Sequence, residues 1–128
     1  MAKFCGIVVG VHIVLTFSQN QMAAGVPGWQ AERDARIATY LCAQYPTVCN
    51  APEPLLAPVA EARVFATDLG FAEDQHVQDV VEACFLFGPA IGTHATFQQI
   101  IRQPLWSQAD KAVAIWHMVI LPRRKALG

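Results

Sequence analysis

The stretch AEDQHVQDVVEACFLF, residues 72–87, decides the fold. Its apolar side chains recur at i, i+3, i+4, i+7 and i+10, the spacing of one helical face; they are Val77, Val80, Val81, Cys84 and Phe87. Acidic residues 73–74 fall in the first turn, where the helix dipole favours negative charge. The stretch therefore predicts a helix with one buried face, on which Cys84 is a small core residue.

Two more helices are predicted before this stretch. Residues 29–44 place Ile37, Tyr40 and Leu41 on one face. Residues 45–54 contain three prolines and predict a loop. Residues 55–69 predict the second helix, which we expect Gly70 to end.

The C-terminal third predicts two further helices. After Gly88-Pro89 we expect a loop over residues 90–93 and a short helix over 96–103, which Pro104 stops. Ser107 with Asp110 three residues later is a variant of the capping box and predicts the start of the last helix, which we expect Pro122 to end. No strand-like alternation follows residue 18. The predicted fold is an all-α, single-domain bundle of about five helices.

The N-terminal segment has a different composition. Residues 4–17 carry no formal charge, and the stretch is too short for a membrane-spanning helix. We therefore separate an apolar segment, residues 1–17, from a helical domain, residues 18–128. Three interpretations stay open: an arm docked on the core, a signal peptide within residues 1–23, or a natural start near Val14. We expect a cytoplasmic protein, a periplasmic one if the signal is cleaved, and membrane contact only if residues 4–17 are kept as an anchor.

Composition narrows the functional classes. The chain has 128 residues, of which 54% are hydrophobic and 15% charged, with a formal net charge of −1. So many apolar residues with so little net charge exclude a disordered chain. The balanced charge argues against nucleic-acid binding. The apolar excess favours a surface that meets a protein partner.

Catalytic and cofactor motifs are weak or absent in the sequence. Neither of the two serines, Ser18 and Ser107, lies in a Gly-x-Ser-x-Gly motif, and the glycines form no phosphate-binding pattern. We expect His76 to make a surface ion pair, and Asp79 and Glu82 to belong to a solvated acidic face. The remaining candidate is His94, in a loop, which would have to converge with an acidic group or a cysteine. The sequence therefore predicts no enzyme, no cofactor and no metal site.

The cysteines leave one question open. Cys42 and Cys49 are separated by six residues, which does not fit the short spacing of a zinc site. They lie on either side of the turn after the first predicted helix. If the protein is exported they can form a disulfide, and otherwise they are two free thiols.

Four residues are candidates for contact with a partner. Trp106 lies in a short connection and Phe97 in the helix before it; each is either an interface anchor or a core residue. Arg123 and Arg124 follow the last apolar helix. They either contact an acidic partner or membrane surface, or stabilise the helix end through its dipole.

From about residue 14 to residue 120 the chain resembles small bacterial helical proteins encoded beside type VI secretion spike and effector genes. The similarity lies in the order of short segments: 15–22, LTFSQNQM; 40–49, YLCAQYPTVC; 66–74, ATDLGFAED; 87–89, FGP; 97–101, FQQII; and 106–114, with its lysine. It departs after Gly88, where those proteins usually have a Phe-Asp pair and this chain has residues 90–94, AIGTH. Residues 1–13 lie outside it, which is why a start near Val14 is considered.

The resemblance implies a non-enzymatic accessory role, adaptor-like or chaperone-like, in which the chain binds a secretion effector or its adaptor. It brings no catalytic residue. One alternative is an immunity protein that blocks a toxin effector, although such proteins usually carry a charged patch that this near-neutral chain lacks. Another is an exported helical protein with a Cys42–Cys49 disulfide.

Overall fold

The computed structural model describes residues 28–127, and all of the regular structure in that range is helical. The predicted N-terminal segment, residues 1–17, lies outside the described residues. The elements are α2 (Gly28–Gln44), η3 (Glu53–Leu55), α3 (Leu56–Asp68), α4 (Asp74–Phe87), η4 (Gly88–Thr93), α5 (Ala95–Ile101), α6 (Gln108–Ile115), η5 (Trp116–Ile120) and α7 (Leu121–Leu127). The last three run on without a break, so these residues form five helices. The predicted all-α bundle is confirmed.

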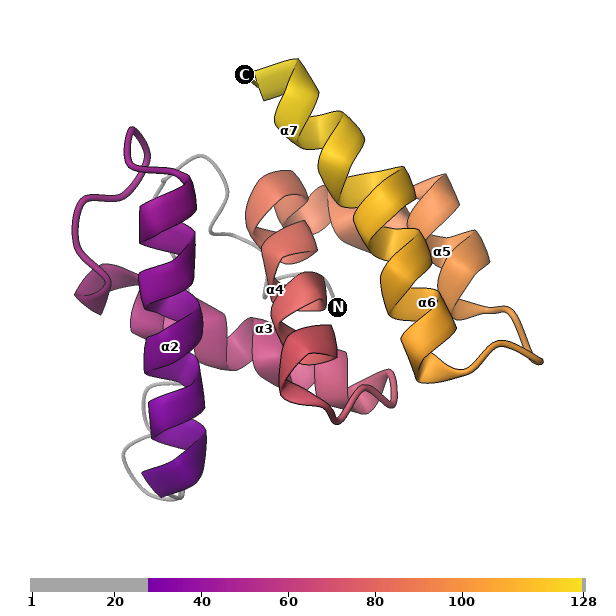
Figure 1. The fold of residues 1–128 in the computed structure, drawn as a ribbon, viewed down its shortest axis with the longest axis horizontal. Coiled ribbons are helices and arrows are strands. Elements are labelled where there is room, and N and C mark those ends of the chain that lie inside the picture. The colour runs from indigo at the N-terminus through magenta and orange to yellow at the C-terminus, as the bar shows by residue number, and fades with distance from the viewer. Residues whose placement is uncertain (1–27, 128) are drawn as a thin grey trace.

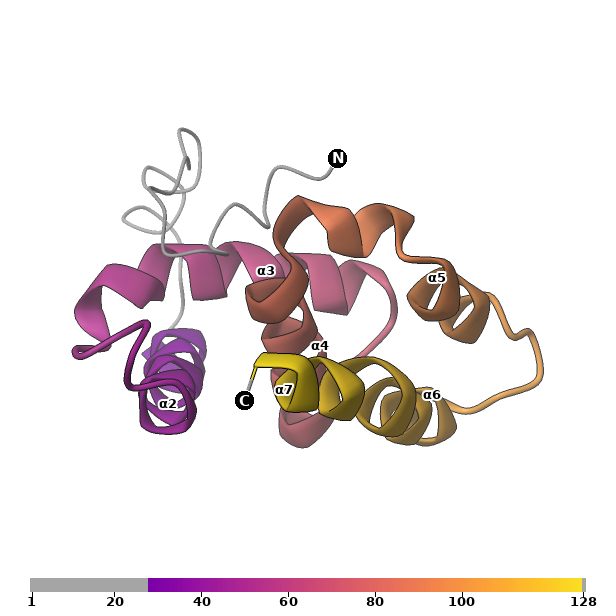
Figure 2. The same cartoon turned by 90° about the horizontal axis from the view of Figure 1, so that it is seen from above.

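Helix α4 is the centre of the bundle. It packs against α3 and α2 on one side and against α6 and η5 on the other. In Figure 1, α2 and the α6–α7 helix lie on opposite sides of α4, and α3 crosses behind. Figure 2, seen from above, shows α3 and α5 on one side of the molecule, with α2 and α7 on the other.

The predicted apolar face of α4 forms the middle of the core. Val77, Val80, Val81 and Cys84 are fully buried, which confirms the core position of the cysteine. Phe71, Phe97 and Ile115 pack in the same cluster from neighbouring segments. Burial of such side chains supplies the main favourable free energy of folding.

The turn between α3 and α4 depends on Gly70, as predicted. Gly70 has a φ of 102°, which favours glycine. Its N–H donates to the Thr67 carbonyl, and the Phe71 N–H donates to the Ala66 carbonyl, the two bonds of a Schellman motif. A Cβ at Gly70 would lie 2.6 Å from the Gln108 side-chain nitrogen, so the turn also lets α6 approach closely.

The predicted end of the last helix at Pro122 is wrong. The helix continues to Leu127 because the turn before the proline, Trp116–Ile120, is a π-helix. In a regular α-helix the proline ring would clash with the carbonyl of Met118, four residues earlier. The wider turn, in which the Leu121 N–H donates to the Trp116 carbonyl, changes this register and lets the chain stay helical.

The other predicted boundaries differ only slightly. Ser107 caps α6 as expected, because its Oγ accepts from the Asp110 N–H at 3.0 Å. The expected loop over residues 90–93 is part of the 3₁₀ helix η4. The short helix α5 begins at Ala95 and ends at Ile101, two residues before the predicted end.

Candidate functional site

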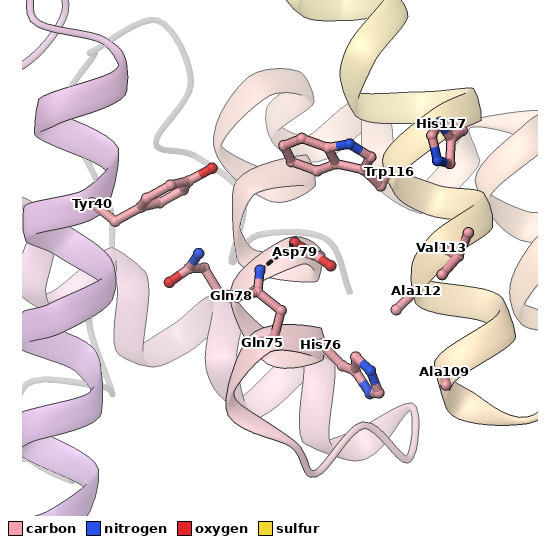
Figure 3. Close-up of a pocket in the computed structure, with 10 residues that line it drawn as sticks. All are labelled: Tyr40, Gln75, His76, Gln78, Asp79, Ala109, Ala112, Val113, Trp116 and His117. Atoms are coloured by element: carbon pink, nitrogen blue, oxygen red, sulfur yellow. Dashed lines mark hydrogen bonds between the residues drawn. The ribbon is translucent and has the colours of Figure 1, made fainter.

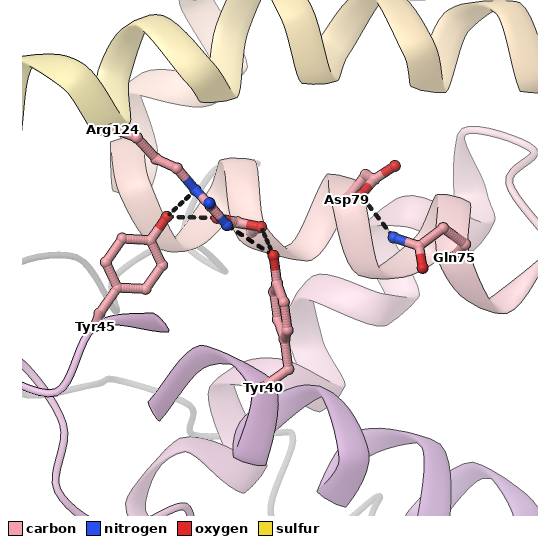
Figure 4. Close-up of polar contacts among 6 residues, drawn as sticks. Tyr40, Tyr45, Gln75, Asp79 and Arg124 are labelled. Atoms are coloured by element: carbon pink, nitrogen blue, oxygen red, sulfur yellow. Dashed lines mark hydrogen bonds and ion pairs between the residues drawn. The ribbon is translucent and has the colours of Figure 1, made fainter. Parts of the chain in front are cut away.

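A group of polar side chains connects α2, the turn after it, α4 and α7. We call Glu82, Arg124, Tyr40 and Tyr45 the Glu82 cluster. Arg124 Nη2 lies 2.7 Å from Glu82 Oε2, and Arg124 Nε lies 2.9 Å from the same oxygen. The Tyr40 hydroxyl donates to Glu82 Oε1 at 2.7 Å, and the Tyr45 hydroxyl donates to Oε2. Figure 4 shows Arg124 reaching from α7 toward both tyrosines.

This cluster corrects the prediction of a solvated acidic face on α4. Glu82 is fully buried and Asp79 is 7% exposed. The prediction was wrong because it assumed that α4 has one buried face, whereas α2, α7 and η5 also cover the opposite one. A buried carboxylate needs a charged or hydrogen-bonding partner, and the cluster supplies three for Glu82.

The cluster raises the pKa values of its two tyrosines and its arginine. Burial raises the pKa of Tyr40 and of Tyr45, and their hydrogen bonds to the Glu82 carboxylate raise it further. Burial alone would lower the pKa of Arg124, but the hydrogen bond and charge of Glu82 outweigh it and the pKa is raised. The tyrosines therefore stay neutral donors and the arginine a cation, so the cluster is a structural connection rather than a source of protons.

A groove of about 460 Å³ lies beside the cluster. It is lined by Gln75, His76, Gln78 and Asp79 of α4, by Ala109, Ala112 and Val113 of α6, by Trp116 and His117 of η5, and by Tyr40 of α2. We call it the α4–α6 groove. In Figure 3, Tyr40 and Trp116 point toward each other from opposite sides, and Asp79 lies below them.

Asp79 is the acidic residue that lines the groove, and its pKa is raised. Its burial raises its pKa to about 6, and the nearby charge of Glu82 adds to the rise. The Gln75 side-chain amide, which donates to Oδ1 at 3.1 Å, opposes the shift, as do the charges of His76 and Arg124. The ion pairs described for residues 28–127 give Asp79 no cationic partner.

The structure uses the two predicted histidine candidates in different ways. His94 is the N-cap of α5: its Nδ1 accepts from the Phe97 N–H at 3.2 Å, and its ring packs edge-on against Phe87. It does not converge with an acid or a cysteine among the described contacts. His76 lines the groove, and its buried Nδ1 has no hydrogen-bond partner among residues 28–127. The structure describes no ion pair for it there.

The four predicted partner-binding residues do not share one surface. Phe97 is fully buried and stacks on Phe65, so it cannot reach a partner while the chain is folded. Trp106 is 41% exposed. Arg123 is half-buried over the Phe87 ring, and Arg124 is held inside the Glu82 cluster. Only Trp106 of the four therefore keeps the exposed position that the prediction assumed.

Two further contacts connect separate segments of the fold; no expectation for the first came from the sequence, which left the second open. The first is an ion pair between α2 and α3, in which Arg63 Nε and Nη2 lie 2.7 Å and 3.1 Å from the two carboxylate oxygens of Asp34. Both residues are buried. The sequence contains one signal for the burial of Asp34. This residue lies three positions before Ile37 and seven before Leu41, the spacing of one helical face.

The second is a disulfide between Cys42 and Cys49. It connects the last turn of α2 to the turn that carries Tyr45. Of the two possibilities that the spacing left open, the structure has the crosslink. No group of three or more His, Cys, Asp or Glu in the described part of the chain is placed to hold a metal ion.

Within residues 28–127 no single helix is long and apolar enough to cross a membrane; Asp74–Thr93 and Ala95–Ile101 meet those criteria only as a pair bent by 90°. Comparison with protein-family models, curated proteins and solved structures gives no match to this chain.

Proposed function

We propose that this protein is a non-enzymatic accessory protein that binds a type VI secretion effector or the effector's adaptor. The ordered segments that resemble small proteins encoded beside spike and effector genes support the secretion system as its setting. The physical support for protein binding comes from the surface between α5 and η5.

The observation that carries this proposal is a run of exposed apolar side chains along residues 105–118. Leu105 is 93% exposed, Val113 58% and Met118 54%, and Trp106 lies between them in sequence at 41%. Large apolar side chains exposed so close together in sequence are typical of protein-binding surfaces. Val113 also lines the α4–α6 groove, so one residue of this run borders the hollow described above.

Three groups within residues 28–127 that catalysis could use have structural roles instead. His94 and Ser107 each cap a helix, and Glu82 is neutralised by Arg124. These roles support a binding protein over a hydrolase, because a general base or nucleophile must be free to exchange its proton with a substrate.

Affinity capture from the native host tests the proposal. The chain is tagged at its C-terminus and its partners are identified by mass spectrometry. We expect a type VI effector or adaptor in stoichiometric amount. The double variant Leu105→Asp/Trp106→Asp should lose this partner, whereas Val64→Asp, a matched change at a 47% exposed residue of α3, should keep it.

Other results would contradict the accessory role. If no secretion component is captured, or if the double variant captures it as well as the wild type, the proposal fails. If the effector is captured and kills the host only when this chain is deleted, the chain is an immunity protein. If deletion instead leaves the host healthy and abolishes effector secretion, the accessory role stands.

The disulfide favours a second candidate, an exported helical protein. Disulfides persist in oxidising compartments such as the periplasm and are rare in the cytosol. Fractionation of the native host, with thiols trapped at lysis, distinguishes the two. Oxidised chain in the periplasm supports export, and reduced chain in the cytosol supports the accessory role.

A further inference from the structure

We propose that the α4–α6 groove binds an arginine side chain of the protein partner, with Asp79 as its counter-ion. This inference rests on the proposed binding function and names the chemistry of the contact. Three observations lead to it: a buried carboxylate with no ion pair among residues 28–127, the aromatic walls of the groove, and the exposed apolar residue Val113 at its side.

The first observation is that Asp79 differs from the other buried acids whose partners are described. Asp34 pairs with Arg63 through both carboxylate oxygens, and Glu82 pairs with Arg124. Asp79, 7% exposed, receives one hydrogen bond from the neutral Gln75 amide, on Oδ1. A buried carboxylate that lacks a cation is electrostatically costly. A cation brought by a partner would remove that cost.

The second observation is the character of the groove walls. Trp116 and Tyr40 present aromatic rings near Asp79, and Ala109 and Ala112 form an apolar side. A guanidinium group is planar, stacks on aromatic rings and is weakly hydrated, while its methylene stem packs on apolar surface. Lysine meets the charge requirement but loses more hydration in such a site. The walls therefore favour arginine.

The structure already shows this chemistry at the same tryptophan. Arg124 Cζ lies 4.9 Å from the centre of the Trp116 ring. The charge of Arg124 is paired with Glu82, and it offsets the rise in the pKa of Asp79 only in part. The remaining titratable groups of the groove are Tyr40, His76 and His117, and none of them forms an ion pair with Asp79 among those described.

The third observation explains why the arginine should belong to a protein. Val113 lines the groove and is also part of the exposed apolar run, 105–118. A partner that covers Val113 would exclude water from that side of the groove, and exclusion of water strengthens a charge pair. The volume of about 460 Å³ is ample for one side chain.

An NMR titration with short peptides tests the proposal. The probes are three acetylated, amidated pentapeptides of glycine with a central arginine, lysine or citrulline; citrulline has nearly the shape of arginine without its charge. We expect the arginine peptide to shift the Trp116 indole N–H and the Ala112 amide, and to bind about tenfold more tightly than the citrulline peptide. The lysine peptide should fall between them.

Two variants locate the binding in the groove. Asp79→Asn removes the charge but keeps the shape, and should abolish the preference for arginine over citrulline. Ala109→Leu fills the groove from its exposed rim and should weaken the arginine peptide without removing any charge. Asp68→Asn, a matched change at an exposed acid of α3, should bind as the wild type does. Because Ala109→Leu leaves the core untouched, the test holds even if Asp79→Asn fails to fold.

Several outcomes would overturn the proposal. These are equal binding of the arginine and citrulline peptides, lysine binding as tightly as arginine, shifts confined to another face, or full binding by Asp79→Asn or Ala109→Leu. Such a failure is distinct from failure of the proposed function: capture of an effector that does not depend on Asp79 would keep the function and reject the arginine site.

Discussion

Arg124 Nη2 lies 2.7 Å from Glu82 Oε2, so a residue near the C-terminus is paired with a fully buried carboxylate in the middle of the central helix. The pair is possible because α7 continues past Pro122. The π-helical turn at Trp116–Ile120 and the ion pair therefore depend on each other: the turn carries the arginine inward, and the pair holds the last helix against α4.

We expect Arg124→Met to destabilise the protein by roughly 3–5 kcal/mol, measured by urea unfolding at neutral pH. Methionine replaces the packing of the arginine stem but leaves Glu82 without a cation in an interior position. The remaining hydrogen bonds from Tyr40 and Tyr45 compensate only in part.

A double-mutant cycle provides the control for this prediction. Glu82→Gln alone leaves Arg124 without its counter-ion, and the double variant Glu82→Gln/Arg124→Met has no unpaired charge. The double variant should lose less stability than the sum of the two single changes, by about 1–3 kcal/mol. Simple additivity would mean that the ion pair contributes nothing specific.

The sequence predicted the helices well because their signals are local. The spacing of Val77, Val80 and Cys84, the position of Gly70, and the cap at Ser107 each act within a few residues of the chain. The prediction failed at Pro122, where the local rule is also sound. At that position the π-helical turn, which packs against α4, lets the helix continue past the proline.

The buried polar groups were harder to predict because their partners are distant in sequence. Glu82 and Arg124 are 42 residues apart, and Asp34 and Arg63 are 29 apart. When apolar residues occupy one face of a helix, an acidic residue on the opposite face is predicted to be exposed to water. That prediction is wrong for a central helix that other helices cover on several sides. The groove was missed for the same reason, since α2, α4, α6 and η5 form it together.

The buried pair between α2 and α3 should matter far more than an exposed one on the same helix. We expect Arg63→Met to cost roughly 3–5 kcal/mol of folding stability, because Asp34 is left buried and burial already raises its pKa. Arg36→Met is the matched control. Its pair with Asp74 is more than half exposed, so the change should cost less than about 1 kcal/mol. Equal losses in urea unfolding would contradict this account.

The disulfide should stabilise the turn that carries Tyr45. Reduction of Cys42–Cys49 removes a short crosslink, and we expect a loss of about 2 kcal/mol, seen as a lower Tm with reductant. A Cys42→Ala/Cys49→Ala variant should show the lower Tm with and without reductant. In a Cys5→Ser background, thiol titration in denaturant should find Cys84 alone. Three reactive thiols there would show that the crosslink is absent.

Asp79 should make the protein less stable as the pH rises. Its pKa is about 6 in the folded chain against an ordinary value of 3.8, so between these values the folded state holds more protons than the unfolded state. Stability from this group is complete below pH 3.8 and is lost as the pH rises through 6. The charge of Glu82 adds to the rise in the pKa of Asp79, and the charges of His76 and Arg124 oppose it. Asp79→Asn, which cannot ionise, should therefore exceed the wild type in unfolding free energy by about 1–3 kcal/mol above pH 7, with the difference shrinking toward pH 4.

Asp34 shifts the stability of both proteins in the same direction, so its contribution cancels in this comparison. Urea unfolding across this range measures the difference, and a gap that does not change with pH would show that the Asp79 carboxyl is not the group responsible.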